Sequence, residues 1–398
     1  MEESKKKNNQ QLFGLYIHIP FCIKKCDYCD FYSIPMCNVV PDYIDALIKE
    51  IYLRSDKNKR IDTIYFGGGT PSVLKVKDIR RIYEAIQLSW KIDPQSEITI
   101  EVNPGTVSKE KITELKSIGI NRINIGIQSF HEKYLKILGR IHTSKESFNA
   151  INLAQKAGFK NIGLDLIYGI PDQTPDEWEK DLDMAIDLNP EHISSYLLTY
   201  EPGTIIHKKK INKTIVPLTD NIIAQMMNKL IFKMETNNFD HYETSNFASS
   251  ADFRSKHNQK YWKQVPYIGI GAAAHSYYKN TRYWNHSNVN AYIKKIYQNL
   301  LPTENSEKLT INQQIIESIF LGLRSKEGII VKDFETKFKS NFYELFSEPL
   351  GHLIKDSYIE YSSFYCRLSR SGHFFLDSIV EQFINSLYNN WNKGIHYD

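Results

Sequence analysis

Three cysteines stand close together near the start of the chain, in the stretch FCIKKCDYCDFYS. They are Cys22, Cys26 and Cys29, and their spacing is C-x3-C-x2-C. Thiolates at such spacing on one loop bind soft metals, which means zinc or an iron–sulfur cluster. Structural zinc takes four ligands, and the remaining cysteines are Cys37 and the distant Cys366. A cluster held by three thiolates would leave one iron open to a ligand, so the sequence supports both interpretations.

Further polar or glycine-rich residues follow apolar stretches later in the chain. They form the segments Gly67–Ser72, Glu101–Thr106 and Gln128–Ser129, together with Asp165. A polar side chain within an apolar strand needs a partner or a ligand, and glycine allows a ligand to approach the backbone closely. Because the carboxyl ends of parallel strands form the site of α/β folds, we expect these residues to line one pocket.

The elements that must position these residues alternate between strand and helix over the first 200 residues. Short apolar runs predict strands, and apolar residues at i, i+3, i+4 and i+7, such as Ile44, Leu47, Ile48 and Ile51, predict helices. The predicted strands are Leu15–Ile19, Ile61–Phe66, Ser96–Val102, Arg122–Gln128, Asn161–Tyr168 and His192–Tyr200. Helices are expected from about Pro41 and over Val76–Ser89, Ser108–Ile118, Glu132–Leu138, Ser144–Ala157 and Thr174–Leu188.

Six β/α units in succession predict the α/β class, with parallel strands joined by crossover helices. A doubly wound sheet and a barrel-like array both fit this pattern. Six strands would make an incomplete barrel, and its open side would admit a large substrate.

The alternation stops after Tyr200. Thr219–Thr236 reads as one long helix, YETSNFA as a short strand or turn, and YIGIGAAAHSYY as a loop rich in glycine and alanine. We expect a polar tail over residues 1–13, a main domain over 14–300 and a boundary in the polar segment 301–310. A C-terminal domain over 311–398 would contain a helix across Ile315–Leu323 and, later, two strands and a helix.

The composition excludes several classes of protein. The net charge of the 398 residues is +4, and we see no dense basic stripe, so no nucleic-acid partner is expected. The N-terminal tail has no apolar segment of a secretory signal, and no apolar window is long enough to predict a transmembrane helix. Five cysteines, three of them crowded together, favour a reducing compartment, the cytoplasm, over a disulfide framework. Peripheral membrane association and the oligomeric state stay open.

The cysteine loop after the first strand, with an aromatic residue before its third cysteine, resembles the radical S-adenosylmethionine (SAM) superfamily. GGGTPS at the end of the second strand resembles the glycine motif of that superfamily. YIHIPFC, EVNPGT, IGIQSF, LGRIHT, DLIYGIPDQT and HNQKYW follow in order and resemble the HemW branch of the coproporphyrinogen dehydrogenase family. The resemblance implies a partial (β/α)6 barrel and a small, mainly helical C-terminal domain, for which a winged-helix form stays open.

The resemblance also assigns roles to individual residues. It implies that a [4Fe–4S] cluster is held by Cys22, Cys26 and Cys29 and that SAM binds its open iron. The residues that match the SAM side of the pocket are Tyr16, Tyr28, Gly68, Gly69, Thr70, Glu101, Gln128, Arg140 and Asp165. Plainer roles stay open for two of them: Tyr16 as a half-buried strand residue, and Arg140 as a cation at the end of a helix. Tyr28 matches a contact to a second SAM in the dehydrogenases, which the sequence does not establish here.

Three differences from the dehydrogenase pattern favour the heme chaperones of this family. The dehydrogenases carry a further cysteine two places after the third one, and this chain has Phe31 there. Their N-terminal arm is longer than the polar tail of this chain. The dehydrogenases also lack the histidine of HNQKYW, which implies heme binding by His257, Tyr261 and Trp262, since imidazole ligates heme iron and aromatic rings contact porphyrin. The plainer reading of His257 is a loop histidine hydrogen-bonded to the backbone.

The expected cofactors are therefore the [4Fe–4S] cluster, SAM and heme, and the expected partners are a heme-accepting protein and an electron donor. Arg254, Lys256 and Lys260 are cations near HNQKYW that could meet heme propionates, although such a group is usually a solvated loop. The runner-up function is oxidative decarboxylation of coproporphyrinogen III. A radical SAM enzyme with another substrate is the third reading, and the sequence does not tell whether SAM is cleaved.

Overall fold

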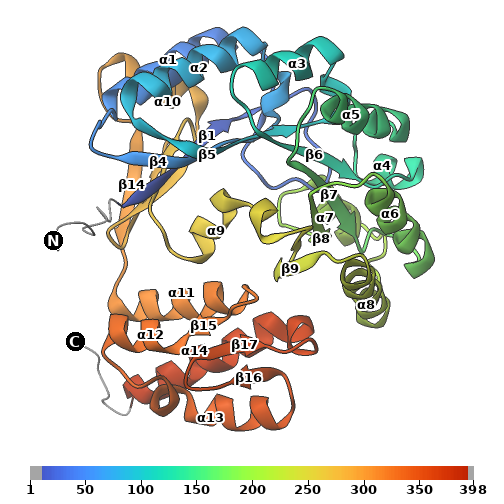
Figure 1. Cartoon of the computed structure of the whole chain (residues 1–398), viewed down its shortest axis with the longest axis vertical. Coiled ribbons are helices and arrows are strands. Elements are labelled where there is room, and N and C mark those ends of the chain that lie inside the picture. Colours follow the sequence, from blue (N-terminus) through green and yellow to red (C-terminus); the bar gives the residue numbers. More distant parts are fainter. Residues whose placement is uncertain (1–10, 393–398) are drawn as a thin grey trace, which may run out of the picture.

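The computed structural model describes residues 11–392, and its central feature is one curved sheet. Six strands pair in parallel in the order β1-β4-β5-β6-β7-β8, which confirms the predicted α/β class. They are β1 (Leu12–Ile19), β4 (Arg60–Gly68), β5 (Lys91–Val102), β6 (Arg122–Gln128), β7 (Ile162–Tyr168) and β8 (His192–Leu197). The sheet bends into an open arc, so the partial barrel is the architecture that this sequence adopts (Figure 1).

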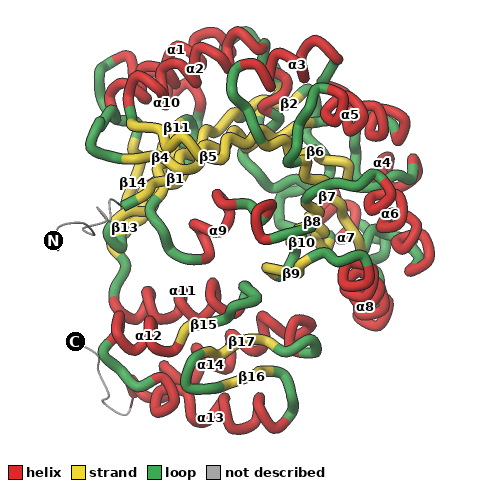
Figure 2. The backbone as a smooth tube through the Cα atoms, in the orientation of Figure 1, coloured by secondary structure: helices red, strands yellow, loops and turns green. Residues whose placement is uncertain are grey.

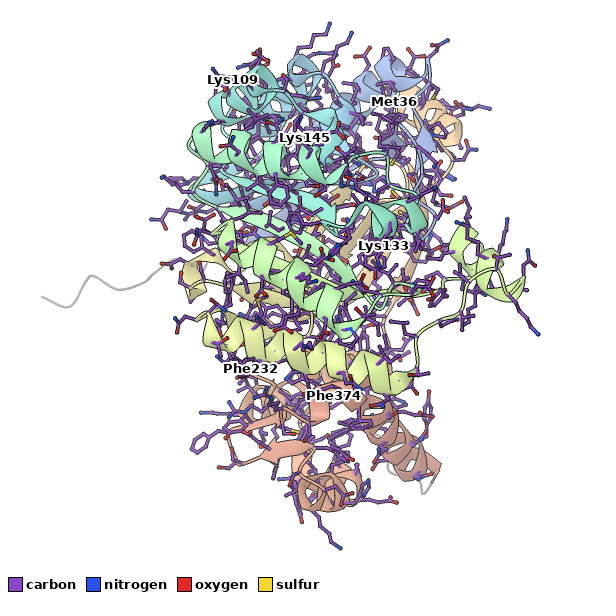
Figure 3. The ribbon with its side chains drawn as sticks, turned by 90° about the vertical axis from the view of Figure 1, so that its right-hand side faces the viewer. Met36, Lys109, Lys133, Lys145, Phe232 and Phe374 are labelled. Atoms are coloured by element: carbon purple, nitrogen blue, oxygen red, sulfur yellow. The ribbon has the colours of Figure 1, made fainter. Side chains whose placement is uncertain are left out.

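Helices that connect these strands cover the outer, convex face of the arc (Figure 1). They are α1 (Val40–Leu53), α2 (Val76–Ser89), α3 (Lys109–Ser117), α4 (Glu132–Ile137), α5 (Ser144–Lys156) and α6 (Pro175–Asp187). Each apolar helix face packs on the sheet; in α1 the predicted residues Ile44, Leu47 and Ile51 are buried. The opposite faces are polar, and Figure 3 shows Lys109 and Lys145 on this side of the molecule.

The sheet continues beyond the six strands at both ends. On the side of β1, the strands β11 (Tyr267–Ile270), β12 (His275–Tyr278), β13 (Thr281–Asn285) and β14 (Thr303–Lys308) extend it. On the side of β8, the strands β10 (Asn246–Ala248) and β9 (Asp240–Glu243) close it. Other elements of this part are the paired short strands β2 (Phe21–Cys22) and β3 (Ile34–Pro35) and the helices α7 (Ile205–Ile211), α8 (Asp220–Thr236) and α10 (Val289–Tyr297).

One sequence prediction is wrong in this extension, and one segment has more structure than expected. YIGIGAAAHSYY forms the antiparallel strands β11 and β12 rather than a loop, and the polar segment 301–310 contains the strand β14 directly before the first helix of the C-terminal domain. In the first case small residues are required by close packing, because a Cβ on Gly269 would lie 2.2 Å from the carbonyl oxygen of His275. In the second case the strand is at the edge of the sheet, and its mostly exposed side chains give it a polar sequence.

HNQKYW is also not a loop. It lies in the short helix α9 (Lys256–Trp262), which sits on the concave side of the arc (Figure 2). The carboxylate of Glu97 on β5 accepts hydrogen bonds from the backbone N–H groups of Lys256 and His257, both at 3.1 Å. The side chain of Ser255 accepts a further one from the N–H of Asn258. These acceptors satisfy the free N–H groups of the first turn and fix the helix inside the barrel.

The C-terminal domain has its own apolar core, formed by residues between 315 and 387. Its elements are α11 (Ile311–Leu323), β15 (Ile329–Ile330), α12 (Val331–Phe338), α13 (Phe342–Lys355), β16 (Ile359–Tyr361), β17 (Tyr365–Leu368) and α14 (Leu376–Asn392). The three strands form a small antiparallel sheet, and the order of elements is the one typical of winged-helix domains. Across residues 11–392, no helix is long and apolar enough to cross a membrane.

Candidate cofactor site

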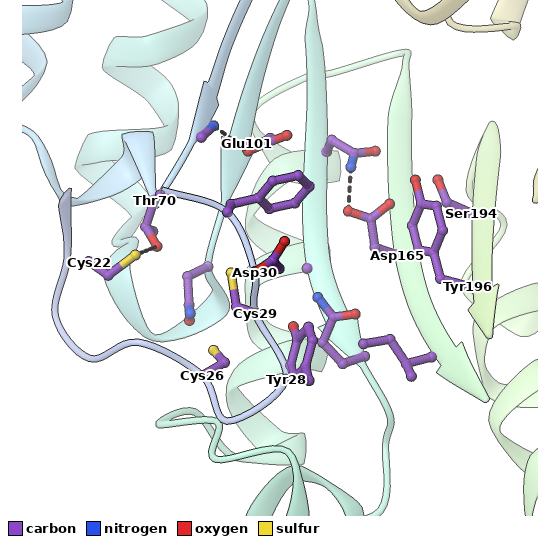
Figure 4. A pocket seen from close by; sticks show the side chains of 18 of the residues that line it. Cys22, Cys26, Tyr28, Cys29, Asp30, Thr70, Glu101, Asp165, Ser194 and Tyr196 are labelled. Carbon is purple, nitrogen blue, oxygen red and sulfur yellow. Dashed lines mark hydrogen bonds between the residues drawn. The ribbon is translucent and has the colours of Figure 1, made fainter. Parts of the chain in front are cut away.

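A cavity of about 430 Å³ opens on the concave side of the sheet, beside the cysteine loop. We call it the cysteine cavity. Of the twelve residues predicted for the cluster and SAM, eleven line it: Cys22, Cys26, Tyr28, Cys29, Gly68, Gly69, Thr70, Glu101, Gln128, Arg140 and Asp165. Figure 4 shows the three cysteines on their loop, facing the strand ends that carry Glu101 and Asp165. The parallel sheet therefore brings together residues that are up to 143 positions apart in the sequence.

The cysteine loop is held from three sides. The N–H of Asp27 donates to the carbonyl of Leu138 at 3.0 Å, and the carboxylate of Asp27 pairs with Lys209 on α7 at 2.6 Å. The hydroxyl of Thr70 lies 3.4 Å from the sulfur of Cys22, and a guanidinium nitrogen of Arg140 lies 3.4 Å from the sulfur of Cys26. Two of the three sulfurs thus already have a hydrogen-bond donor in the protein.

The three thiols of the loop are the candidate metal ligands of the cysteine cavity. Among residues 11–392, no three His, Cys, Asp or Glu side chains are grouped around one point as ligands of a single metal ion. In a cluster, each of the three thiolates would bind a different iron. Burial raises the pKa of the Cys29 thiol to about 11, and metal binding would reverse this effect by stabilising the thiolate.

The glycine motif packs closely against the cysteine loop. Gly68 has a φ of +109°, and a Cβ there would lie 2.6 Å from the ring of His18. A Cβ on Gly69 would lie 2.8 Å from the carbonyl oxygen of Phe21, and the N–H groups of Gly69 and Thr70 donate to Ile19 and Phe21 at 2.8 Å. Glycine is therefore required at position 68 by the positive φ and the ring of His18, and at position 69 by the backbone before Cys22. The role of Gly68 and Gly69 in SAM binding stays a prediction.

Buried polar groups face the cavity without partners in the protein. Asp165 accepts a hydrogen bond from Asn124 at 2.6 Å through one carboxylate oxygen, but its other oxygen has no partner among the described residues (Figure 4). The same is true of the Nε of Arg140, whose other nitrogens contact Cys26 and the carbonyl of Gly126. Because buried polar groups are normally paired, these two atoms indicate a site for a polar ligand.

Glu101 differs from Asp165 in having partners for both of its carboxylate oxygens. It accepts hydrogen bonds from the hydroxyl of Tyr65 at 2.8 Å and from the N–H of Gly68 at 3.3 Å. Burial nevertheless raises its pKa to about 7, and the nearby charge of Asp165 adds to this effect. Burial also raises the pKa of Asp165. Ionisation of both carboxyl groups is therefore disfavoured in the empty cavity, and a cationic ligand would favour it.

Several residues that line the cavity were not predicted from the sequence, among them Tyr65, Arg122, Asn124, His192, Ser194 and Tyr196. The spacing of polar residues along the strands could have indicated them. Asn124, Gly126 and Gln128 are two residues apart on β6, and His192, Ser194 and Tyr196 repeat this spacing on β8. Side chains at that spacing share one face of a strand, and these face the cavity.

Tyr16 is the one residue predicted for the SAM pocket that is not among those lining the cavity. Its hydroxyl lies 3.1 Å from Nδ1 of His18, and its ring lies beside those of Tyr65 and His257, with centroids 6.2 and 6.4 Å away. Tyr16 thus supports Tyr65, which does line the cavity. Its role beside SAM stays a prediction.

The three residues predicted to bind heme do not share one pocket. His257 is only 1% exposed, and its two ring nitrogens lie 2.8 Å from the hydroxyls of Thr63 and Tyr261. Tyr261 lines a second cavity, and Trp262 packs under the guanidinium of Arg324. Burial lowers the pKa of His257 to about 3, so its ring is neutral. Heme ligation by His257 stays a prediction, and it would require these two hydrogen bonds to break.

Comparisons with known proteins agree with this geometry. The Radical SAM superfamily matches residues 16–185, and the HemN C-terminal domain matches residues 309–375. Heme chaperone HemW of Lactococcus lactis is 36% identical over 93% of this chain and 96% of its own length. The protein of that name from Bacillus subtilis is 35% identical over 94% of this chain and 99% of its own.

The chain belongs to the HemW family. Its fold is also that of coproporphyrinogen III oxidase HemN from Escherichia coli, with a TM-score of 0.82 over 94% of this chain and 90% of that one. The two sequences are 22% identical, so this likeness concerns the fold alone.

As a HemW-family member of the radical SAM superfamily, the chain is expected to hold a [4Fe–4S] cluster and SAM, and the cysteine cavity fits both. The three sulfurs are on one loop at its rim, and unpaired polar atoms of Asp165 and Arg140 lie beside them.

Proposed function

We propose that this protein binds heme and delivers it to acceptor proteins, and that the cysteine cavity holds its [4Fe–4S] cluster and SAM. One observation carries the proposal: relatives named heme chaperones match it at 36% and 35% identity over more than nine-tenths of both chains. Identity at that level over whole chains covers both the barrel and the C-terminal domain. The five free cysteines suit a reducing compartment, the cytoplasm.

Different residues of the cysteine cavity would bind the cluster and SAM. Cys22, Cys26 and Cys29 would supply thiolates to three irons, while the hydroxyl of Thr70 and the guanidinium of Arg140 would stabilise two of those sulfurs. The unpaired oxygen of Asp165 would accept from a hydroxyl of SAM, and Glu101 would face its positive charge. When bound, the cluster and SAM supply one-electron chemistry that side chains lack.

One position in the cysteine loop favours a chaperone over a coproporphyrinogen dehydrogenase. Phe31 stands where the dehydrogenases carry a further cysteine, and its side chain is 72% exposed at the edge of the cavity. A phenyl ring offers neither a thiolate nor a hydrogen bond.

An electron donor would meet the cluster from this exposed edge, where Lys24 and Lys25 would suit an acidic partner.

The decisive experiment uses the full chain after anaerobic reconstitution of its cluster. Titration with hemin is expected to produce a Soret band at a defined stoichiometry, and incubation with coproporphyrinogen III, SAM and a reductant is expected to give no protoporphyrinogen IX. E. coli HemN, assayed in parallel, supplies the positive control for turnover. Robust turnover by this protein, or no binding of hemin, would overturn the proposal.

A further inference from the structure

A second cavity, of about 300 Å³, lies between the extension of the sheet and helix α11 of the C-terminal domain. We call it the tyrosine cavity. The residues that matter for its chemistry are Tyr261, Tyr267, His275, Tyr277, Arg282 and Glu317. Aromatic walls with a few polar groups are typical of sites for flat organic ligands. The roles proposed for the cysteine cavity, binding of the cluster and of SAM, leave this second cavity without a function.

The register of the sheet places most of these side chains on one face. Tyr267 on β11 pairs with Tyr277 on β12, and Tyr277 pairs with Arg282 on β13. His275 is two residues before Tyr277, so its side chain points the same way. It pairs with Trp284, and their rings stack with centroids 5.7 Å apart. The strands therefore present a row of rings, one of them an imidazole, ended by a guanidinium.

His275 and His257 differ in the availability of their ring nitrogens. His275 is exposed, and within residues 11–392 neither of its ring nitrogens has a hydrogen bond. Partial burial and the neighbouring Arg282 lower its pKa, which keeps the ring neutral at physiological pH. A neutral imidazole with a free nitrogen is the form that binds iron. The ring of His257, in contrast, is buried and engaged on both sides.

The tyrosine of HNQKYW, Tyr261, lines the tyrosine cavity. The ring of Tyr261 packs edge-on against that of Tyr267, with centroids 4.7 Å apart, while its hydroxyl is held by His257. Asn258 of the same helix lines the cysteine cavity. Helix α9 thus lies between the two cavities, and His257 acts as a positioning residue for a wall of the second one.

Arg282 supplies the charge that a carboxylate ligand would need. It pairs with Glu317 of α11 at 2.5 Å, and its side chain is 41% exposed. A guanidinium has five N–H donors, so the ion pair leaves donors for a second carboxylate.

We propose that the tyrosine cavity is the heme site of this protein, with His275 as a ligand to the iron and Arg282 as the partner of a propionate. The inference rests on the proposed function, since it names the place where a heme chaperone would hold its cargo. The cavity is smaller than heme, so part of the porphyrin would stay exposed. An exposed porphyrin edge suits a chaperone that must transfer heme to an acceptor protein.

The test is a hemin titration of the full chain, with wild type and four variants compared by the Soret band and by affinity. His275→Ala removes the proposed ligand and is expected to shift the band and weaken binding. Arg282→Gln is expected to weaken binding about ten- to a hundredfold, the usual effect of losing a charged hydrogen bond. Cluster content and SAM binding should stay as in wild type, because the cysteine cavity is not touched.

Two control variants match these changes. His286→Ala removes a histidine outside both cavities and should leave the titration unaltered. Glu317→Gln breaks the same ion pair as Arg282→Gln but leaves the guanidinium in place, so it should keep or strengthen heme binding.

The outcomes separate the two proposals. If wild type binds hemin and both His275→Ala and Arg282→Gln bind it equally well with the same spectrum, the tyrosine cavity is not the site, although the chaperone function stands. If wild type binds no hemin, the proposed function itself fails. Equal weakening by Arg282→Gln and Glu317→Gln would show that the ion pair matters for structure and would remove the propionate role.

Discussion

Glu101 and Asp165 show how burial sets the charge of single residues in the cysteine cavity. Both carboxyl groups are buried on neighbouring parts of the sheet, and burial raises both pKa values. Glu101 ionises near pH 7, whereas an exposed glutamate does so near 4.5. The folded state therefore holds this proton over a pH range in which the unfolded chain has released it.

This difference predicts a pH dependence with a definite sign. Below about pH 4.5 the carboxyl is neutral in both states; between about 4.5 and 7 it ionises first in the unfolded chain, so the folded state loses stability as the pH rises. Glu101→Gln stays neutral and should show a smaller decline, because only Asp165 still contributes one. The free energy of unfolding of cluster-free protein, measured by urea at several pH values, checks this. A wild-type minus variant difference that is constant across that range would contradict it.

Each of the three cysteines Cys22, Cys26 and Cys29 is predicted to be essential for the cluster. Cys22→Ala, Cys26→Ala and Cys29→Ala should each abolish a reconstituted cluster of about four irons. Cys37 is exposed and Cys366 is buried in the C-terminal domain, so Cys37→Ala and Cys366→Ala should retain it. Iron analysis and the visible absorption spectrum measure the outcome. Loss of the cluster in Cys37→Ala would mean that a fourth cysteine fills the position we assign to SAM.

At the scale of elements, the turn after β4 connects the glycine motif to the cysteine loop. Its N–H groups donate to the backbone around Phe21, so the turn and the loop form one unit. Gly69→Ala should therefore lower the free energy of unfolding by about 1–3 kcal/mol, because a new Cβ would meet backbone at 2.8 Å. Thermal and urea unfolding of the cluster-free protein measure it.

Gly105 supplies the matched control for this glycine. It belongs to the turn after β5, and a Cβ there would come no closer than 3.4 Å to its nearest neighbour, a side-chain atom of His142. Gly105→Ala should change the free energy of unfolding by less than about 1 kcal/mol. Equal effects of the two substitutions would show that the contact with Phe21 is not what requires glycine at position 69.

Elements with a strong local pattern were predictable from the sequence, and those defined by distant contacts were not. The amphipathic pattern gave the bounds Val76–Ser89 of α2 without error. Helix α9 was missed because it has only seven residues and depends on Glu97, about 160 positions earlier. The burial of His257 follows from that placement, so its two hydrogen bonds could not be foreseen. Cavity residues at strand ends were predicted, because parallel strands bring their ends together.

At the scale of the whole molecule, charged pairs join the C-terminal domain to the barrel. Arg324 pairs with Glu243 on β9 at 2.9 Å, and its guanidinium also lies 4.9 Å from the ring of Trp262 on α9. Arg370 pairs with Glu235 on α8 at 3.1 Å. Both contacts cross between the domains, but Glu243 is 1% exposed whereas both members of the other pair are more than half exposed.

The difference in burial predicts unequal effects of two otherwise similar substitutions. Arg324→Ala would leave the carboxylate of Glu243 buried without its cation and should lower the free energy of unfolding by about 3 kcal/mol. Arg370→Ala should cost less than about 1 kcal/mol, because water screens the exposed pair and solvates Glu235 once it is alone. Urea unfolding of the cluster-free chain measures both. Adding Glu243→Gln to Arg324→Ala should restore part of the loss, since the orphaned charge is then absent. If Arg324→Ala is as mild as Arg370→Ala, the barrel and the C-terminal domain are not held together by the buried pair.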